Sequence, residues 1–137
     1  MMQHITDYIP QRPPIVMIDK LIQSDLDSAL SSLHILPTNI FVEDGKLTEP
    51  GLIENIAQTA AAMVGYQSAL HKMPTPLGYI ASIKELVINF LPEAMSTIHT
   101  NIRVTNTVMD ITIIKGSIEQ DNRIICSCEM RILIQKN

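Results

Sequence analysis

The second half of the chain alternates apolar and polar residues over long stretches, and this pattern limits the fold more than any other feature. The alternation runs through residues 98–104 and again through 124–134. A period of two places successive side chains on opposite faces of a β-strand. Residues 79–90 and 108–118 also have strand character, and short polar turns separate the last three segments. We therefore predict four late strands in a mostly antiparallel sheet.

Residues 51–70 follow a different period. Leu52, Ile56, Met63 and Leu70 are spaced by four and seven, and the segment contains five alanines and no β-branched run. This spacing predicts one long helix, with the preceding proline suited to its first turn. The glycine at position 65 costs a helix about 1 kcal/mol relative to alanine, which indicates a helix held by packing on most sides.

The first half of the chain predicts an extended arm and two strands. Prolines at positions 10, 13 and 14 exclude a helix there, and the apolar segment 15–23 reads as an extended arm leading into the first strand. Residues 28–36 predict a second strand, and 41–49 a loop. The expected fold is α+β, with an antiparallel sheet wrapped around one central helix.

Length and charge indicate a single domain over residues 1–137 and exclude some partners. The chain has 137 residues, a net charge of -4 and only ten lysines and arginines, which are scattered. Nucleic-acid binding needs clustered positive charge, so none is expected. No apolar run reaches the roughly 20 residues that span a bilayer, and residues 1–4 lack a leader pattern. We therefore expect no membrane association and a cytoplasmic location.

Two cysteines, Cys126 and Cys128, are separated by one residue within the last predicted strand. A strand would place both thiols on one face, where we expect the two cysteines to act as small buried hydrophobic residues. A metal site would need two further ligands, and no ligand cluster appears in the sequence. We expect no metal and no cofactor.

Three local patterns in the right order carry a family resemblance. The first is Ile9-Pro10-Gln11-Arg12-Pro13-Pro14 followed by an apolar segment ending in Asp19-Lys20. The second is Asn39-Ile40-Phe41, then Pro50-Gly51, then Glu54-Asn55-Ile56-Ala57-Gln58, and the third is the segment 83–92. Together they resemble the hot-dog fold, specifically the β-hydroxyacyl-acyl-carrier-protein dehydratases of fatty-acid synthesis. The resemblance covers about residues 5–135.

The resemblance implies a site made of a base, an acid and a backbone donor. In the family a histidine removes a proton beside the thioester carbonyl, and a helix carboxylic acid protonates the departing hydroxyl. Glu54 matches the acid, the amide near Gly51 matches the donor that polarises the thioester, and Gln58 lies one turn from Glu54 to orient it. The catalytic candidates are thus Glu54 and Gln11, and the substrate-binding candidates are Gly51 and Gln58. Helix capping alone would also explain a carboxylate at Glu54.

Gln11 is the main departure, because it stands where the family has its histidine. A carboxamide has no titratable nitrogen near neutral pH, although it can hydrogen-bond a substrate group or a water. The four histidines of the chain read as ordinary surface or satisfied residues, and His4 is the least implausible substitute. The family's loop before the helix is also shorter here, at residues 44–49.

Three functions follow from this pattern. The first is dehydration of a 3-hydroxyacyl thioester, with Glu54 acting alone or with a histidine from another subunit. The second is a thioesterase in which Glu54 acts as nucleophile or base, while Gln11 and Gln58 position a water. The third is a non-catalytic acyl-binding subunit of a heteromeric dehydratase. The implied partners are an acyl carrier protein or a coenzyme A thioester, and a second chain. That chain would form a homodimer, a higher assembly of dimers, or a heterodimer with a histidine-bearing paralogue, with Gln11 of one chain facing Glu54 of the other.

Overall fold

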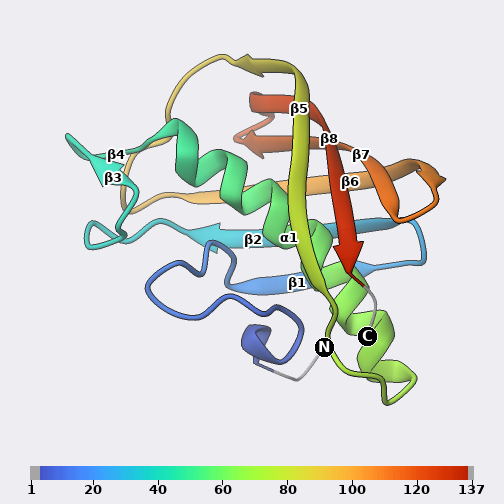
Figure 1. Cartoon of the computed structure of the whole chain (residues 1–137). Helices are drawn as coiled ribbons and strands as arrows, with labels where there is room; N and C mark the ends of the chain where they lie inside the picture. The colour runs from blue at the N-terminus through green and yellow to red at the C-terminus, as the bar shows by residue number, and fades with distance from the viewer. Residues whose placement is uncertain (1–3, 136–137) are drawn as a thin grey trace.

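In the computed structural model, which describes residues 4–135, one long helix packs against a curved antiparallel sheet (Figure 1). The sheet has six strands in the order β1-β2-β6-β7-β8-β5, and a second sheet pairs β3 with β4. The elements are η1 (Ile5–Asp7), β1 (Lys20–Ser24), β2 (Ser28–His34), β3 (Val42–Glu43), β4 (Lys46–Leu47), α1 (Glu49–Leu70), β5 (Leu77–Ile88), β6 (Thr97–Val108), β7 (Ile111–Gln120) and β8 (Arg123–Gln135). The predicted fold class is confirmed. The first three residues, where no leader was expected, lie outside the described part, as do residues 136–137.

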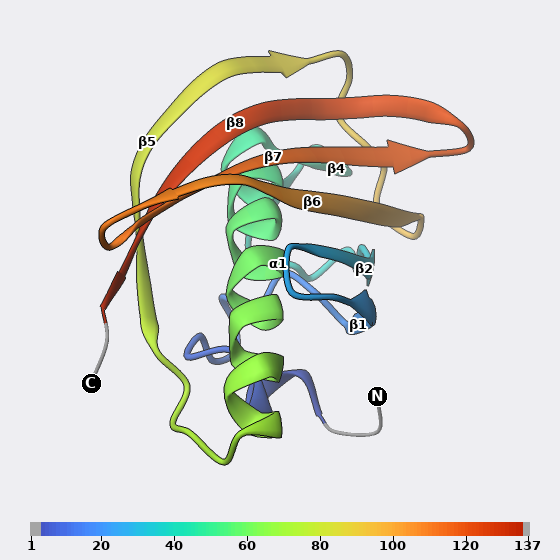
Figure 2. The ribbon, with the colours of Figure 1, turned by 90° about the vertical axis from the view of Figure 1, so that its right-hand side faces the viewer.

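The sheet wraps around α1, with β5 on one side of the helix and β1 on the other (Figure 2). Strands β6, β7 and β8 form the predicted antiparallel meander. Strand β5 precedes them in the chain but pairs with β8, while β6 pairs with β2. This order leaves β1 and β5 as the two edges of the sheet.

The N-terminal arm leads into the first strand, as predicted for residues 15–23. Residues 15–19 have no regular structure, and β1 starts at Lys20. The backbone of Ile15 and Met17 hydrogen-bonds to side chains of α1 instead of to a neighbouring strand. Buried side chains of the helix therefore took the place of a strand partner, which local β propensity cannot reveal.

Smaller corrections concern element ends. Strand β2 ends at His34, two residues before the predicted end, because the N–H of Ile35 donates to Ser96 O outside the β2–β6 register. The predicted loop at 41–49 contains the short β3–β4 hairpin, and α1 begins at Glu49 rather than Gly51. Leu70, which fits the helical spacing, is exposed at the end of α1.

The core fills the space between α1 and the concave side of the sheet. Gly65 lies so close to the N-terminal arm that an added Cβ would be 1.7 Å from the carbonyl oxygen of Tyr8. At Gly116 in β7, an added Cβ would be 2.6 Å from Ile56 Cγ2. Gly65 lets the N-terminal arm approach α1, and Gly116 lets β7 approach it. The first contact agrees with the prediction that packing holds the helix around Gly65. The fully buried large side chains are Ile9, Met17, Ile18, Ile35, Leu47, Leu52, Ile56, Ile98, Ile114, Ile118, Ile125 and Met130.

Cys126 and Cys128 are both free and buried, as predicted for small core residues. Burial raises the pKa of each thiol to about 11, and for Cys126 the neighbouring Cys128 thiolate adds to the rise. No helix in the described residues has the length and apolar character needed to cross a membrane.

Candidate functional site

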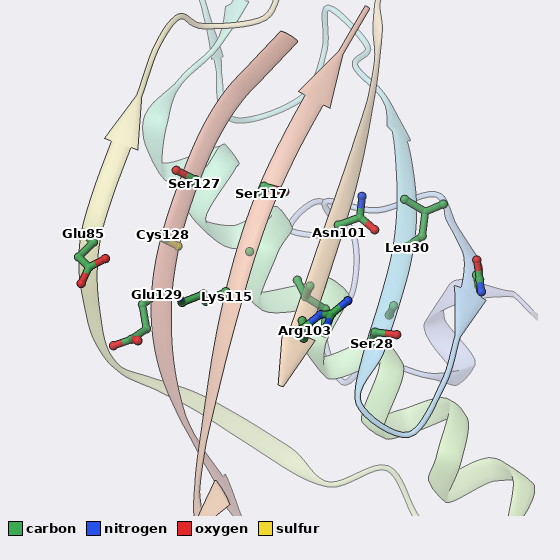
Figure 3. Close-up of a pocket in the computed structure, with 14 residues that line it drawn as sticks. Ser28, Leu30, Glu85, Asn101, Arg103, Lys115, Ser117, Ser127, Cys128 and Glu129 are labelled. Atoms are coloured by element: carbon green, nitrogen blue, oxygen red, sulfur yellow. The ribbon is translucent and has the colours of Figure 1, made fainter. Parts of the chain in front are cut away.

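The larger of two relevant hollows lies on the outer face of the sheet, away from α1. It has a volume of about 780 Å³, and its lining comes from all six strands of the sheet. Figure 3 shows its charged and hydroxyl side chains, among them Glu85, Arg103, Lys115 and Glu129. None of the four predicted site residues lines it. A polar hollow on the outside of a sheet is a poor site for an acyl chain, so the candidate site lies elsewhere.

The smaller hollow, which we call the acyl cavity, lies between α1, the N-terminal arm and the β5 side of the sheet. It has a volume of about 230 Å³ and contains both Gln11 and Glu54. A single chain therefore brings these two predicted catalytic residues to one cavity. The remaining lining is largely apolar: Ala57, Ala60, Ala61, Met63, Val64, Pro76, Gly78, Tyr79, Ile80, Thr112, Ile114, Ile132 and Ile134.

The helix contributes one stripe of residues to this cavity. Glu54, Ala57, Ala61 and Val64 follow one another at spacings of three and four, which places them on one face of α1. From Glu54 to Val64 the helix rises about 15 Å. The stripe thus runs from a carboxylate to a wholly apolar end.

Gln58 holds Glu54 and the N-terminal arm together. Its Nε2 donates to Glu54 Oε1 at 2.9 Å and to the carbonyl of Ile15 at 3.0 Å, while its Oε1 accepts from Met17 N at 2.7 Å. Gln58 is fully buried and does not line the acyl cavity. The geometry gives it the orienting contact that we predicted from its spacing to Glu54, whereas a direct contact with substrate stays a prediction.

A second buried amide fastens the same arm, and the sequence analysis missed it. Asn55 Nδ2 donates to the carbonyl of Met17 at 2.8 Å, and Asn55 Oδ1 accepts a hydrogen bond from the hydroxyl of Thr100 on β6. The hydroxyl of Thr59 donates to the carbonyl of Asn55 and contacts Ser31 Oγ at 2.7 Å. We call Asn55, Gln58 and Thr59 together the polar clasp. A signal did exist, because asparagine, glutamine and threonine interrupt an otherwise apolar helix face at positions 55, 58 and 59.

Gln11 lies on the arm that the polar clasp holds. The Arg12 guanidinium donates to the carbonyls of Ile9 and Gln11, at 2.7 and 2.8 Å, and folds the arm back on itself. Gln11 Oε1 is buried and has no hydrogen-bond partner among the described residues. A buried acceptor without a partner is costly, so this oxygen favours a ligand or water that donates to it.

Gly51 is not brought to the cavity. Its N–H donates to the carbonyl of Thr48 at 3.0 Å in the first turn of α1. An added Cβ there would be 2.7 Å from Leu47 Cδ1 and 2.8 Å from Phe41 Cβ, so the residue packs against the β3–β4 hairpin. Its role as a thioester donor stays a prediction, and the geometry adds no support.

None of the four histidines lines the acyl cavity. His4 caps η1 by accepting from Thr6 N at 3.2 Å, and it is exposed. His34 contacts Thr97 Oγ1, and the ring of His71 contacts the carbonyl of Gln67. His99 is exposed on the outer face of β6, as its phase in the alternation predicts. This chain supplies no imidazole to the site.

A family model described as "ApeP-like: ApeP dehydratase" matches residues 3–137. The chain belongs to the ApeP-like dehydratase family. The predicted resemblance to hot-dog dehydratases is therefore confirmed, and the ApeP-like match covers nearly the whole chain. No curated protein matches it.

Solved structures similar to this ApeP-like chain share its fold at low identity. The dehydratase heterocomplex ApeI:P from Xenorhabdus doucetiae has a TM-score of 0.92 at 14% identity, covering 100% of this chain and 94% of that chain. A hypothetical thioesterase with coenzyme A from Streptococcus pneumoniae has a TM-score of 0.68 at 8% identity, covering 86% of each chain. The E. coli PaaI protein from the phenylacetic acid degradation operon has a TM-score of 0.67 at 10% identity, covering 83% of this chain and 81% of that chain.

Proposed function

We propose that this chain is an acyl-thioester-binding subunit of a dehydratase that acts on 3-hydroxyacyl thioesters, and that a histidine-bearing partner chain completes its site. The observation that carries the proposal is the acyl cavity, in which Glu54 and Gln11 lie beside a mostly apolar wall. A polar end next to an apolar hollow fits a ligand with a polar thioester and a hydrocarbon tail.

The chemistry assigns Glu54 the role of general acid. Dehydration breaks the bond between C3 and its hydroxyl oxygen, and the electron pair of the C2–H bond becomes the new C2=C3 double bond. Protonated Glu54 would deliver a proton to the departing oxygen, which leaves as water. Gln58 fixes one carboxyl oxygen of Glu54 by donating to it, so the other oxygen is available to the substrate.

The base must come from outside this chain. Gln11 cannot take up the C2 proton, but its unpartnered Oε1 can accept a hydrogen bond from the substrate hydroxyl or a water. A second chain with a histidine in reach of Glu54 would supply the base. The similar solved structure from Xenorhabdus doucetiae is a dehydratase heterocomplex, which supports a heteromeric assembly as the form to test first.

The edge strand β5 is where we propose that the partner joins. It has twelve residues, none of them buried, and its exposed apolar side chains include Leu77, Tyr79 and Val87. An unpaired edge offers a row of backbone donors and acceptors to a second strand. Gly78, Tyr79 and Ile80 of the same strand line the acyl cavity, so a partner placed there would also reach the site.

The test is dehydration of 3-hydroxyacyl carrier-protein and coenzyme A thioesters by the purified chain, alone and with a histidine-bearing hot-dog chain from the same organism. We expect enoyl product from the complex and at least a 100-fold loss of rate in Glu54→Gln. Glu49→Gln is the matched control, because Glu49 is an exposed carboxylate in the first turn of the same helix. We also expect Gln11→His to gain activity without a partner. Absence of enoyl product from the chain alone, from the complex and from Gln11→His would overturn the dehydratase role.

A thioesterase is the second candidate, favoured by one observation. The buried Oε1 of Gln11 could accept a hydrogen bond from a water in the cavity that it shares with Glu54. Glu54 would then be the base that activates this water. Free thiol released from acyl thioesters, and lost in Glu54→Gln, would support hydrolysis. Acyl binding with neither hydrolysis nor dehydration would leave the non-catalytic subunit as the function.

A further inference from the structure

We infer that the acyl cavity accepts a chain of about nine carbon atoms, and that Ala61 and Val64 set this limit. The inference rests on the proposed function, because it takes the ligand to be an acyl thioester. It names the length class of the substrate, which neither the family match nor the fold specifies.

The capacity follows from the volume. A dry apolar cavity of about 150 Å³ in another protein holds one benzene molecule, that is, six carbon atoms. In the same ratio, the volume of about 230 Å³ corresponds to about nine carbon-sized groups. A long-chain acyl group of 14 to 16 carbons would exceed this capacity by about five to seven carbons.

The small residues of α1 create the space. Three alanines line the cavity from the helix, whereas the sheet contributes the branched side chains of Ile80, Ile114, Ile132 and Ile134. Packed interiors leave few voids larger than a water, so side-chain size on the helix decides how much hollow is left. Ala61 lies two helical turns beyond Glu54, and Val64 is the last lining residue of the stripe. Bulk added at either position therefore meets the tail of a chain whose thioester lies near Glu54.

Both residues belong to α1 and not to the edge strand. Pairing of a partner along β5 would close the cavity from the side of Gly78 and Tyr79 without replacing the helix stripe. The limit is thus a property of this chain, which allows it to be measured on the assembled protein.

The experiment measures calorimetric binding of saturated acyl-coenzyme A thioesters from 4 to 16 carbons to the purified protein in its assembled form. Each buried methylene should strengthen binding about four-fold until the cavity is full. We expect the strongest binding near eight to ten carbons and no further gain beyond. Ala61→Leu adds three carbons to the wall and should shorten the preferred chain by about three. Val64→Ala removes two and should lengthen it by about two.

Ala69→Leu is the control, because Ala69 is exposed on the same helix and does not line the cavity. Should Ala61→Leu fail to fold, the enlarging variant Val64→Ala still tests the limit in the opposite direction. An affinity that keeps rising to 16 carbons, or a preferred length unchanged in both cavity variants, would overturn the inference while leaving an acyl-binding function in place. No binding of any chain length would overturn both.

Discussion

The two sides of the central helix are built in opposite ways. On the β1 side, the polar clasp of Asn55, Gln58 and Thr59 fastens α1 to the N-terminal arm and to the sheet, and all three residues are fully buried. On the β5 side, α1 presents alanines to a hollow, and the sheet ends in a long strand that pairs only with β8 among the described residues. The first side holds the molecule together, and the second side is where we propose that a ligand and a partner bind.

The two sheet edges repeat this contrast. Strand β1 has five residues and a register shift between Leu21 and Gln23, features that discourage pairing with another chain. Strand β5 has twelve residues and lines the acyl cavity. A long exposed apolar edge invites aggregation unless a partner covers it, which fits the proposal that a partner joins at β5 and completes the site.

The largest expected effect comes from removing a member of the polar clasp on the β1 side. Asn55→Leu leaves the carbonyl of Met17 and the hydroxyl of Thr100 without their partner, and each unpaired buried group costs about 1–3 kcal/mol. We expect the free energy of unfolding to fall by about 3 kcal/mol, as measured by urea denaturation. Gln67→Leu, at a less buried position of the same helix, should change it by less than about 0.5 kcal/mol. Equal effects of the two substitutions would show that the clasp does not hold the arm.

The next effect tests the two edges against each other. Tyr79 on β5 and Ile22 on β1 are exposed to similar extents, 53% and 46%. A lysine in an edge strand opposes pairing with a second strand. Tyr79→Lys should weaken assembly at least about ten-fold in sedimentation velocity, whereas Ile22→Lys should leave it unchanged. Loss of assembly with Ile22→Lys instead would place the partner on the opposite edge.

The effect that is smallest at neutral pH concerns the thiols of β8, the neighbour of β5. The pKa of Cys126 and Cys128 is raised from 9.0 to about 11 in the folded state, mainly by burial. The folded protein therefore holds these protons more tightly than the unfolded chain, and stability falls as the pH rises. We expect constant stability below about pH 8 and a loss of up to about 2 kcal/mol for each thiol as the pH rises from 9 to 11.

Chemical denaturation at several pH values measures this loss. The variant Cys126→Ala/Cys128→Ala lowers overall stability, but it should remove most of the decline above pH 9. A decline of the same size in that variant would assign the pH dependence to other groups.

Much of the fold was predictable because its elements have clear periods. The alternation in residues 98–134 specified β6, β7 and β8, and the alanine-rich segment specified α1. The extended arm at 15–19 was predicted, but not how it is held: Gln58 and Asn55 bind its backbone from about 40 residues away in the sequence. Local propensity cannot anticipate a long-range partner of this kind.

The candidate site was predictable only in part. The motif order drew attention to Gln11, Glu54 and Gln58, and the Gln58–Glu54 contact follows from helical spacing. Gly51 was selected in the same way, but its N–H is used within the first helical turn. Tyr79 and Thr112 line the cavity and had no signal, because their sequence distance from the helix motif hides their position.

By itself, the sequence determined the element types, the antiparallel sheet around one helix, and the absence of the family's histidine at Gln11. These properties depend on side-chain period and residue identity, which are local. Only the tertiary structure decided that β5 pairs with β8 at the edge, that the arm is fastened by buried amides, and that Gln11 and Glu54 share one cavity. Those features depend on which distant surfaces pack together to bury apolar area and satisfy polar groups, and such pairings are set by the whole chain at once.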